Sequence, residues 1–391
     1  MPDLRAPFPA VSAAFFLNGA LFGVWASRIP AFVERLALEP DTLGLLLLML
    51  AGGAIASFPF AGTLTDRLGA WRLTRWLAGI YLVGLVLLAF APNVWTLALF
   101  LGIFGVGHGG MDVAMNAWAA EVERALARSV MSIFHGMFSL GAGAGALSGF
   151  VAGLAGLGVP AHFLAAAACL SVAMFFMTSR PWAGQGSTPH QGAVFALPKK
   201  ALLAVGLVAF ATCVGEGAMA DWSAVYLDTV LGATPAQAAL GYAAFSVTMV
   251  AMRLSGGIVI ARLGPALAAR LSGCCALAGA IIVVTAPVLA VALVGFALLG
   301  VGYAVIMPLA FSRAAADPEV PPGRAIASVA TLSYGGMLLG PPVLGFIAHA
   351  TSLPTALSLL GVLACVTIAF GSVLSIDKSP GLAYPRETGS L

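Results

Sequence analysis

The sequence has few charged residues. Only 8% of its 391 residues are Asp, Glu, Lys or Arg, whereas 61% are hydrophobic. A soluble globular domain carries about 25% charged residues, so water cannot be the solvent for most of this surface. The composition argues against a soluble protein and predicts a chain whose main partner is a lipid bilayer.

Motifs of common enzyme chemistry are also missing. The chain has no Gly-x4-Gly-Lys-Ser/Thr loop for nucleotide phosphates, no His-Glu-x-x-His metal motif and no Gly-x-Ser-x-Gly nucleophile motif. Its five cysteines lie in apolar segments, which argues against a disulfide framework. We therefore expect no catalytic residue, no cofactor, no bound metal and no nucleic-acid partner. A polytopic membrane enzyme, a sensor or a channel is the alternative of another class.

What the chain has is a series of long apolar segments without period-2 alternation, which predicts membrane-spanning helices. A bilayer core of about 30 Å needs roughly 20 apolar residues per helix. We interpret the first segment as a span rather than a signal peptide, because no Ala-x-Ala cleavage site followed by a soluble domain appears. Only Pro287 and its neighbours separate the ninth span from the tenth. The expected spans are near 8–27, 41–62, 73–91, 94–119, 129–153, 158–178, 200–223, 237–258, 266–286, 288–311, 326–349 and 354–376.

The predicted fold is therefore all-α, with twelve transmembrane helices in two pseudo-symmetric six-helix bundles. A polar stretch near the middle of the chain is typical of a linker between them. We expect an N-terminal bundle over 1–179, a cytoplasmic linker over 180–199, a C-terminal bundle over 200–378 and a cytoplasmic tail over 379–391.

The basic residues predict the orientation. All of them except Arg28, Arg35 and Arg253 fall on one side if the N-terminus is inside. By the positive-inside rule this places both termini in the cytoplasm, in a multi-pass protein of the cell inner membrane.

Two short motifs recur in the same order. Residues 62–69, Gly-Thr-Leu-Thr-Asp-Arg-Leu-Gly, match 257–264, Gly-Ile-Val-Ile-Ala-Arg-Leu-Gly. Residues 105–108, Gly-Val-Gly-His, match 300–303, Gly-Val-Gly-Tyr, and both pairs have the same separation along the chain. This indicates a duplication, which is typical of transporters with a midplane site between two halves.

The first of these motifs resembles the loop 2–3 signature of the major facilitator superfamily. Gly62, Asp66, Arg67 and Gly69 match the signature, although Ala70 stands where a basic residue is usual. The resemblance implies that these four residues form a conformational latch against the start of span eleven. The second copy has Ala261 in place of the aspartate, so its latch should be weaker.

A narrower resemblance is to fucose-permease-type sugar–proton symporters. Phe15-Phe16-Leu17-x-Gly19 is similar to their first span, and Asp112-Val-Ala-Met-Asn116 is similar to a stretch of their fourth. These symporters have an aspartate near the end of span one, where this chain has Trp25-Ala26. The resemblance implies a sugar-like solute and proton coupling, but not fucose itself.

Buried polar residues are the candidates for proton coupling. A charged group at the bilayer centre costs at least about 2.5–3.5 kcal/mol, so its presence favours a function. His108 and Asp112 lie on one stripe of span four, and His135 enters span five at a similar depth. With Glu216 in span seven, these residues are the predicted proton-coupling set. The alternatives for the span-four cluster are a packing network of hydrogen bonds and a metal site.

The predicted substrate-binding residues are polar or aromatic and lie within spans. Glu216 is flanked by glycines that would let a ligand approach its carboxylate, and two tyrosines stand at the repeat positions of the two histidines. The set is Asn18, Asn116, Glu216, Tyr303 and Tyr334.

Other polar and aromatic residues at span ends have simpler interpretations. Trp25 and Trp222 are expected in an aromatic belt at the outer interface, and Trp118 and Trp71 are expected in one at the inner interface. Arg253 is expected to reach the cytoplasmic interface or to pair with a carbonyl group. A pairing of Arg28 with Asp221 as an outer gate is a further hypothesis.

The resulting prediction is a secondary active transporter, acting as a monomer. It would move a small polar solute, most simply a sugar-like one, by alternating access coupled to protons. Proton-coupled export of drugs or metabolites is the alternative. We expect the N-terminal half to carry most of the proton chemistry and the C-terminal half to determine the fit of the substrate.

Overall fold

The computed structural model describes residues 7–126, 130–178, 201–320 and 322–375. Within these ranges the chain is helical and contains no strand. The predicted linker over 180–199 and tail over 379–391 lie outside the described residues. The helices are α1 (Pro7–Ala26), α2 (Ile29–Leu36), α3 (Pro40–Leu68), α4 (Ala70–Ala89), α5 (Val94–Leu126), α6 (Met131–Leu154), α7 (Val159–Thr178), α8 (Ala201–Thr229), α9 (Pro235–Ala238), α10 (Leu240–Leu263), α11 (Pro265–Thr285), α12 (Leu289–Tyr303), α13 (Ile306–Ala315), α14 (Pro322–Ala350) and α15 (Leu353–Phe370), followed by the 3₁₀ helix η1 (Gly371–Leu374).

The predicted all-α fold with twelve spans is confirmed. Eleven spans in the described chain are long and apolar enough to cross a membrane, with α1–α2, α9–α10 and α12–α13 each counted as one. The twelfth is α7, whose described apolar part is shorter. The ninth and tenth spans separate at Pro287, as expected, because α11 ends at Thr285 and α12 begins at Leu289.

Two helices extend well beyond the predicted spans. α3 continues to Leu68 and α5 to Leu126, whereas the apolar segments end near 62 and 119. Hydropathy detects only the part of a helix that contacts lipid, and both helices continue as polar turns. Gly69 ends α3 with a positive φ of 85°, and its repeat counterpart Gly264 ends α10 with a φ of 77°. Glycine adopts this conformation without steric cost, which explains why both copies of the motif end in it.

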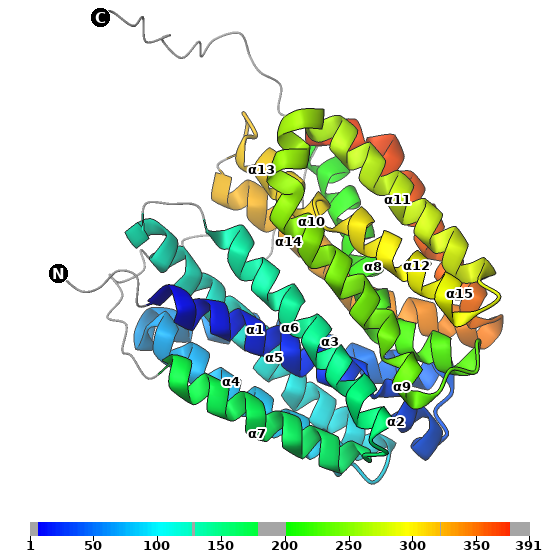
Figure 1. The fold of residues 1–391 in the computed structure, drawn as a ribbon. Coiled ribbons are helices and arrows are strands. Elements are labelled where there is room, and N and C mark those ends of the chain that lie inside the picture. Colours follow the sequence, from blue (N-terminus) through cyan, green and yellow to red (C-terminus); the bar gives the residue numbers. More distant parts are fainter. Residues whose placement is uncertain (1–6, 127–129, 179–200, 321, 376–391) are drawn as a thin grey trace, which may run out of the picture.

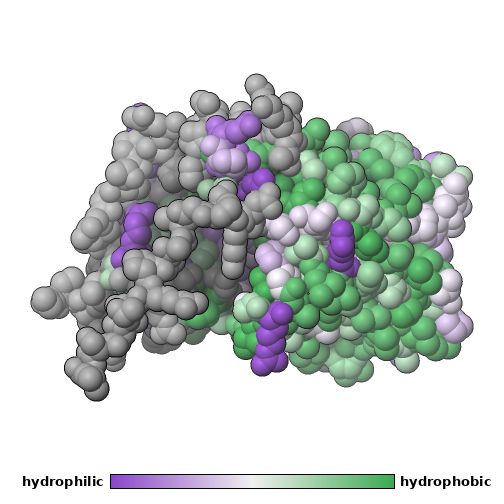
Figure 2. Space-filling view, turned by 90° about the horizontal axis from the view of Figure 1, so that it is seen from above, coloured by the Kyte–Doolittle hydropathy of each residue, from purple (hydrophilic) through white to green (hydrophobic). Residues whose placement is uncertain are grey.

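The spans form two bundles that lie side by side (Figure 1). The first contains α1–α7 and the second contains α8–α15. The visible flank of the molecule is predominantly hydrophobic, with few hydrophilic residues (Figure 2). Large apolar side chains are correspondingly exposed on the protein, including Phe60 and Val247. Such a surface requires lipid rather than water around it.

The two bundles are closest at one end. We define the α2 end as the end where α2 and α9 lie, and the Arg67 end as the opposite one, where α3 ends. Near the α2 end, a Cβ atom on Gly345 of α14 would lie 2.5 Å from the carbonyl oxygen of Pro40 in α3. Toward the Arg67 end of α3, a Cβ on Gly62 would meet no described atom within 4 Å, and the same holds for a Cβ on Gly335 in the middle of α14. Among these glycines, the close approach of α3 and α14 is therefore at the α2 end, where the halves are closed.

The prediction of an interfacial belt is wrong for three of the four tryptophans. Trp25, Trp118 and Trp222 are fully buried inside the bundles rather than placed in a belt facing the lipid. Trp25 packs against Phe32 and Phe104, with ring centroids 5.1 Å and 6.4 Å away. These indoles fill volume between helices, which sequence position alone does not distinguish from an interfacial location.

Candidate functional site

Asn18 joins α1 to α5 inside the first bundle. Its side-chain nitrogen donates a hydrogen bond to the backbone carbonyl of His108 over 3.2 Å. Its Oδ1 atom is buried and has no hydrogen-bond partner among the described residues, and the same holds for Nδ1 of His108. Both predicted residues therefore lie together, and each has an unused polar atom.

Aromatic rings surround His108 and continue into the second bundle. Phe22 of α1 stacks on the imidazole with a centroid separation of 5.1 Å, and Tyr81 of α4 lies 5.4 Å from it. Phe22 also faces the ring of Tyr242 in α10 at 6.5 Å. Sequence reasoning missed Phe22 and Tyr242, because neither the aromatic type nor its spacing distinguishes a site residue from a packing residue.

Asp112 lies one helical turn beyond His108 on α5. Asn116 donates from Nδ2 to the Asp112 carboxylate over 3.1 Å and to the Asp112 carbonyl over 2.8 Å. The predicted polar stripe on span four is therefore present. Within it, the side-chain amide of Asn116 already donates to one carboxylate oxygen of Asp112. In the part of the chain that the structure describes, no three His, Cys, Asp or Glu side chains are grouped to hold a metal ion.

The second carboxylate of the predicted set is paired. Arg253 of α10 donates from Nη2 to Oε2 of Glu216 in α8 over 3.2 Å, and from Nη1 to Oγ of Ser139 in α6 over 2.6 Å. The expectation that Arg253 reaches the interface or a carbonyl group is wrong. Its side chain is 14% exposed and that of Glu216 is 28% exposed, so solvent screens the pair only partly. Oε1 of Glu216 is buried without a partner among the described residues.

Through Ser139, the side chain of Arg253 also connects the two bundles. Glu216 and Arg253 belong to the second bundle, whereas Ser139 belongs to the first. Ser139 in turn donates to the carbonyl of His135, one turn earlier on α6, over 3.3 Å. His135 contacts Phe15 edge-on at 5.3 Å. The sequence did contain one indication of this role for Arg253, namely its position inside a span. A cation there indicates a functional site as much as a carboxylate does.

The two predicted tyrosines, Tyr303 and Tyr334, contact different helices. Tyr303, the last residue of α12, is buried so closely against Gly215 that a Cβ atom there would clash with Cζ of its ring. Its hydroxyl has no partner among the described residues. Tyr334 of α14 instead meets Phe58 of α3, from the other bundle, edge-on at 5.1 Å. The substrate set is therefore spread over both bundles.

Arg28 forms its side-chain hydrogen bonds within the first bundle. Its Nε donates to Nδ1 of His162 in α7 over 3.1 Å, and Nη2 donates to the carbonyl of Leu157 over 3.0 Å. Nε2 of His162 lies 2.9 Å from Oγ of Ser148 in α6. The hypothesised Arg28–Asp221 gate is therefore not formed. Asp221 is buried in α8.

The latch residues lie at the Arg67 end. Asp66 and Arg67 form the exposed last turn of α3, directly before Gly69. The side chains at the very start of α14, over 322–324, are outside the described residues, so the expected contact with that helix stays a prediction.

Comparisons with known proteins identify the family. The sequence model of the Major Facilitator Superfamily matches residues 11–320. The chain belongs to the major facilitator superfamily. The match covers most of both bundles, and it agrees with the duplicated six-span architecture. The protein is thus a multi-pass membrane transporter of this superfamily.

Relatives along the full length are transporters or membrane proteins. The chain is 44% identical to the uncharacterized transporter y4wD of Sinorhizobium fredii over 375 residues, which cover 96% of this chain and 100% of that protein. It is 33% identical to the membrane protein MosC of Rhizobium meliloti, over 97% of this chain and 94% of that one.

Solved structures of the superfamily share the fold. A mutant of the nucleoside transporter NupG aligns with a TM-score of 0.76 at 12% identity, over 93% of this chain and 98% of that one. A bacterial homologue of the human lysosomal transporter Spinster, in an inward-facing and occupied conformation, aligns with a TM-score of 0.73 at 16% identity, over 96% and 97%. At these identities the likeness concerns the fold alone.

Proposed function

We propose that this superfamily member is a proton-coupled secondary transporter of a small, sugar-like polar solute. The observation that carries the proposal is the Glu216–Arg253–Ser139 connection between the bundles. A titratable carboxylate in an inter-bundle contact links a proton to the relative position of the two halves. Asp112, hydrogen-bonded to Asn116 in the first bundle, supplies a second carboxylate.

Coupling would work through the charge of Glu216. While it is ionised, it holds the guanidinium of Arg253, which also binds Ser139 across the interface. A proton on Glu216 removes that attraction and leaves Arg253 free to change partner, which loosens the contact between the bundles. A membrane interior strengthens this effect, because its low dielectric makes an unpaired charge costly.

The proposed substrate site lies among the polar atoms that the protein leaves unused. Oδ1 of Asn18, Oε1 of Glu216 and the hydroxyl of Tyr303 are buried without partners among the described residues. The hydroxyl groups of a sugar or polyol would satisfy these atoms, and the rings of Phe22 and Tyr242 would cover its apolar face. Asn116 and Tyr334 would complete the site from α5 and α14.

The proposed setting is the cell inner membrane, with both termini cytoplasmic and residues 180–199 as the linker between the halves. The Arg67 end is then cytoplasmic, and the observed closure at the α2 end corresponds to an inward-facing state. We propose that Asp66 and Arg67 act as a latch when the transporter opens to the other side, and that it works as a monomer by alternating access.

Transport in proteoliposomes tests the proposal. A thermal-shift screen of sugars, polyols, nucleosides and amino acids selects a ligand, and its radiolabelled form is then used for uptake with and without an inward proton gradient. We expect the gradient to drive accumulation and counterflow to proceed without it. Uptake that ignores the gradient would contradict proton coupling, and uptake driven by an outward instead of an inward proton gradient would indicate proton–solute antiport and assign the protein to export.

A further inference from the structure

A groove opens on the outer flank of the first bundle, between α4 and α7. These two helices lie next to each other at the side of the bundle that faces away from α8–α15 (Figure 1). The groove has a volume of about 500 Å³ and is lined by residues of α4 and the second half of α7. It lies near the Arg67 end and is remote from the inter-bundle site.

The mouth of the groove is basic and aromatic. Arg72 is exposed there, and the guanidinium of Arg75 sits over the indole of Trp71 at 5.1 Å. Trp76 is 73% exposed beside them. Nε1 of Trp71 is buried without a hydrogen-bond partner among the described residues. None of the described residues that line the groove is Asp or Glu. The two guanidinium groups together match the oxygens of a phosphate group.

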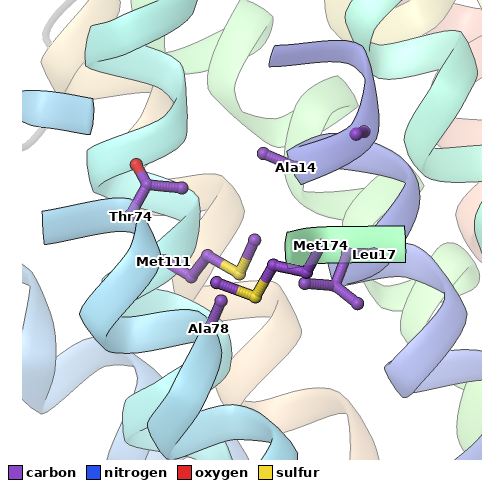
Figure 3. Close-up of a pocket in the computed structure, with 7 residues that line it drawn as sticks. Ala14, Leu17, Thr74, Ala78, Met111 and Met174 are labelled. Atoms are coloured by element: carbon purple, nitrogen blue, oxygen red, sulfur yellow. The ribbon is translucent and has the colours of Figure 1, made fainter. Parts of the chain in front are cut away.

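The rest of the groove is apolar. Leu82 and Met174 line it further along α4 and α7. Met174 also lines a small internal void, where it points toward Met111 (Figure 3). That void measures about 10 Å³, roughly the space of one water molecule, so it adds no deeper chamber to the groove. The adjoining face of α4 exposes Val83 to the surroundings, at 56% of its surface.

We propose that this groove binds the head group of an anionic phospholipid, with its acyl chains along the exposed face of α4. Charge complementarity selects an anion, and the opening onto a flank that must face lipid selects a phospholipid over a soluble phosphate. Basic pockets between membrane helices with interfacial tryptophans are suited to such head groups. The inference rests on the family fold and is independent of the proposed solute and its coupling.

The second bundle offers an internal control, because its corresponding helix lacks the site. α11 keeps a basic residue, Arg270, at the repeat position of Arg75. It has Ala266, Leu267 and Leu271 where α4 has Trp71, Arg72 and Trp76. The duplication thus predicts one lipid site per chain rather than two.

Native mass spectrometry of the full-length protein tests the proposal. The detergent-purified chain is mixed with phosphatidylglycerol or phosphatidylcholine of the same acyl chains, and retained lipids are counted. We expect one tightly retained phosphatidylglycerol and no such phosphatidylcholine. In R72Q/R75Q its affinity should fall about tenfold or more, as loss of two charges near an anionic surface implies. The control R262Q/R270Q, with the same change in net charge, should bind as the wild type does.

Three further measurements distinguish a specific lipid site from general charge attraction, from misfolding and from a site for free phosphate. R72K/R75K keeps the charges and should retain most of the phosphatidylglycerol binding. It also keeps the proposal testable if the glutamine variant does not fold. Phosphatidylglycerol should raise the unfolding temperature of the wild type and of R262Q/R270Q more than that of R72Q/R75Q. Equal retention of both lipids, equal loss in the two charge-removing variants, or displacement of the lipid by millimolar inorganic phosphate would overturn the proposal.

Discussion

Arg253 binds Glu216 within its own bundle and Ser139 in the other one, at 3.2 Å and 2.6 Å. One planar guanidinium thus serves two acceptors on two halves that must move relative to each other. Arginine suits this position because its planar fork of donors has a fixed geometry and can reach both acceptors at once. The hydrogen bond to Ser139 has only one charged partner, so it breaks at a lower cost than the ion pair. We therefore expect Arg253 to release Ser139 more readily than Glu216 while Glu216 is ionised, and to leave Glu216 only when that carboxylate takes up a proton.

Removing one partner of this ion pair should be more damaging than removing both. Arg253→Ala leaves the Glu216 carboxylate without its counter-charge in a membrane interior, and Glu216→Ala leaves the guanidinium unpaired. Truncating one partner of a buried pair costs about 3–5 kcal/mol, and partial exposure of this pair reduces the cost. We expect each single variant to unfold at a lower temperature in detergent, and the double variant to recover part of the loss.

Ser139→Ala is the matched control for the hydrogen bond between the bundles. It removes the acceptor on α6 and leaves the ion pair intact, so it should change stability by about 1.5–3 kcal/mol, less than loss of an ion-pair partner. Its effect should appear in the distribution between conformations, measured by labelling of a cysteine introduced between the bundles near the Arg67 end. For the ion pair itself, the losses of unfolding temperature in Arg253→Ala and Glu216→Ala should not simply add in the double variant. Additive losses would contradict an energetic coupling between the two side chains.

Asp112→Asn tests the other carboxylate. Asparagine keeps an oxygen that accepts the hydrogen bond from Asn116, so the local packing of α5 should persist. It cannot take up and release a proton in the cycle. We expect counterflow to continue while accumulation driven by a proton gradient is lost. Uptake with the wild-type dependence on the gradient would assign Asp112 to packing instead, and Asn116→Ala separates loss of the hydrogen bond from loss of the titratable group.

The contact of Arg28 with His162 fixes the imidazole in one tautomer. Because Nε of Arg28 is a donor, Nδ1 of His162 must accept, and Nε2 then carries the proton that faces Ser148. Glutamine can reproduce one acceptor and one donor, whereas leucine can do neither. We expect His162→Leu to lower the unfolding temperature clearly and His162→Gln to retain most of the wild-type value. Equal effects of the two variants would indicate that shape rather than hydrogen bonding matters there.

The sequence was sufficient for the fold and for part of the site, for identifiable reasons. Apolar length determines spans in lipid, and the repeated motif at Gly62 and Gly257 indicates the duplication. The pairing of Asn116 with Asp112 follows from helical spacing within one element. By contrast, the contacts of Arg253 and Arg28 join helices far apart in the chain, and no local pattern specifies them. Burial of Trp25 likewise depends on which face of its helix meets a neighbour.

The glycines beside Glu216 give a test that separates substrate fit from proton chemistry. A Cβ at position 215 would clash with Cζ of Tyr303, whereas a Cβ at position 217 would meet no atom of the described residues within 4 Å. Gly215→Ala must therefore displace the tyrosine ring, and Gly217→Ala adds a methyl group in open space. Both changes have the same effect on helix propensity, so the difference between them reports on Tyr303.

We expect Gly215→Ala to weaken binding of the transported solute about tenfold, the effect of losing one well-placed contact, and to leave the dependence of uptake on the proton gradient unchanged. Gly217→Ala should bind as the wild type does. Combining Gly215→Ala with Tyr303→Ala removes the clash, so its affinity should equal that of Tyr303→Ala alone. If the double variant instead binds more weakly than Tyr303→Ala, the glycine itself must contact the solute, and the approach of the ligand to Glu216 runs over the backbone of α8.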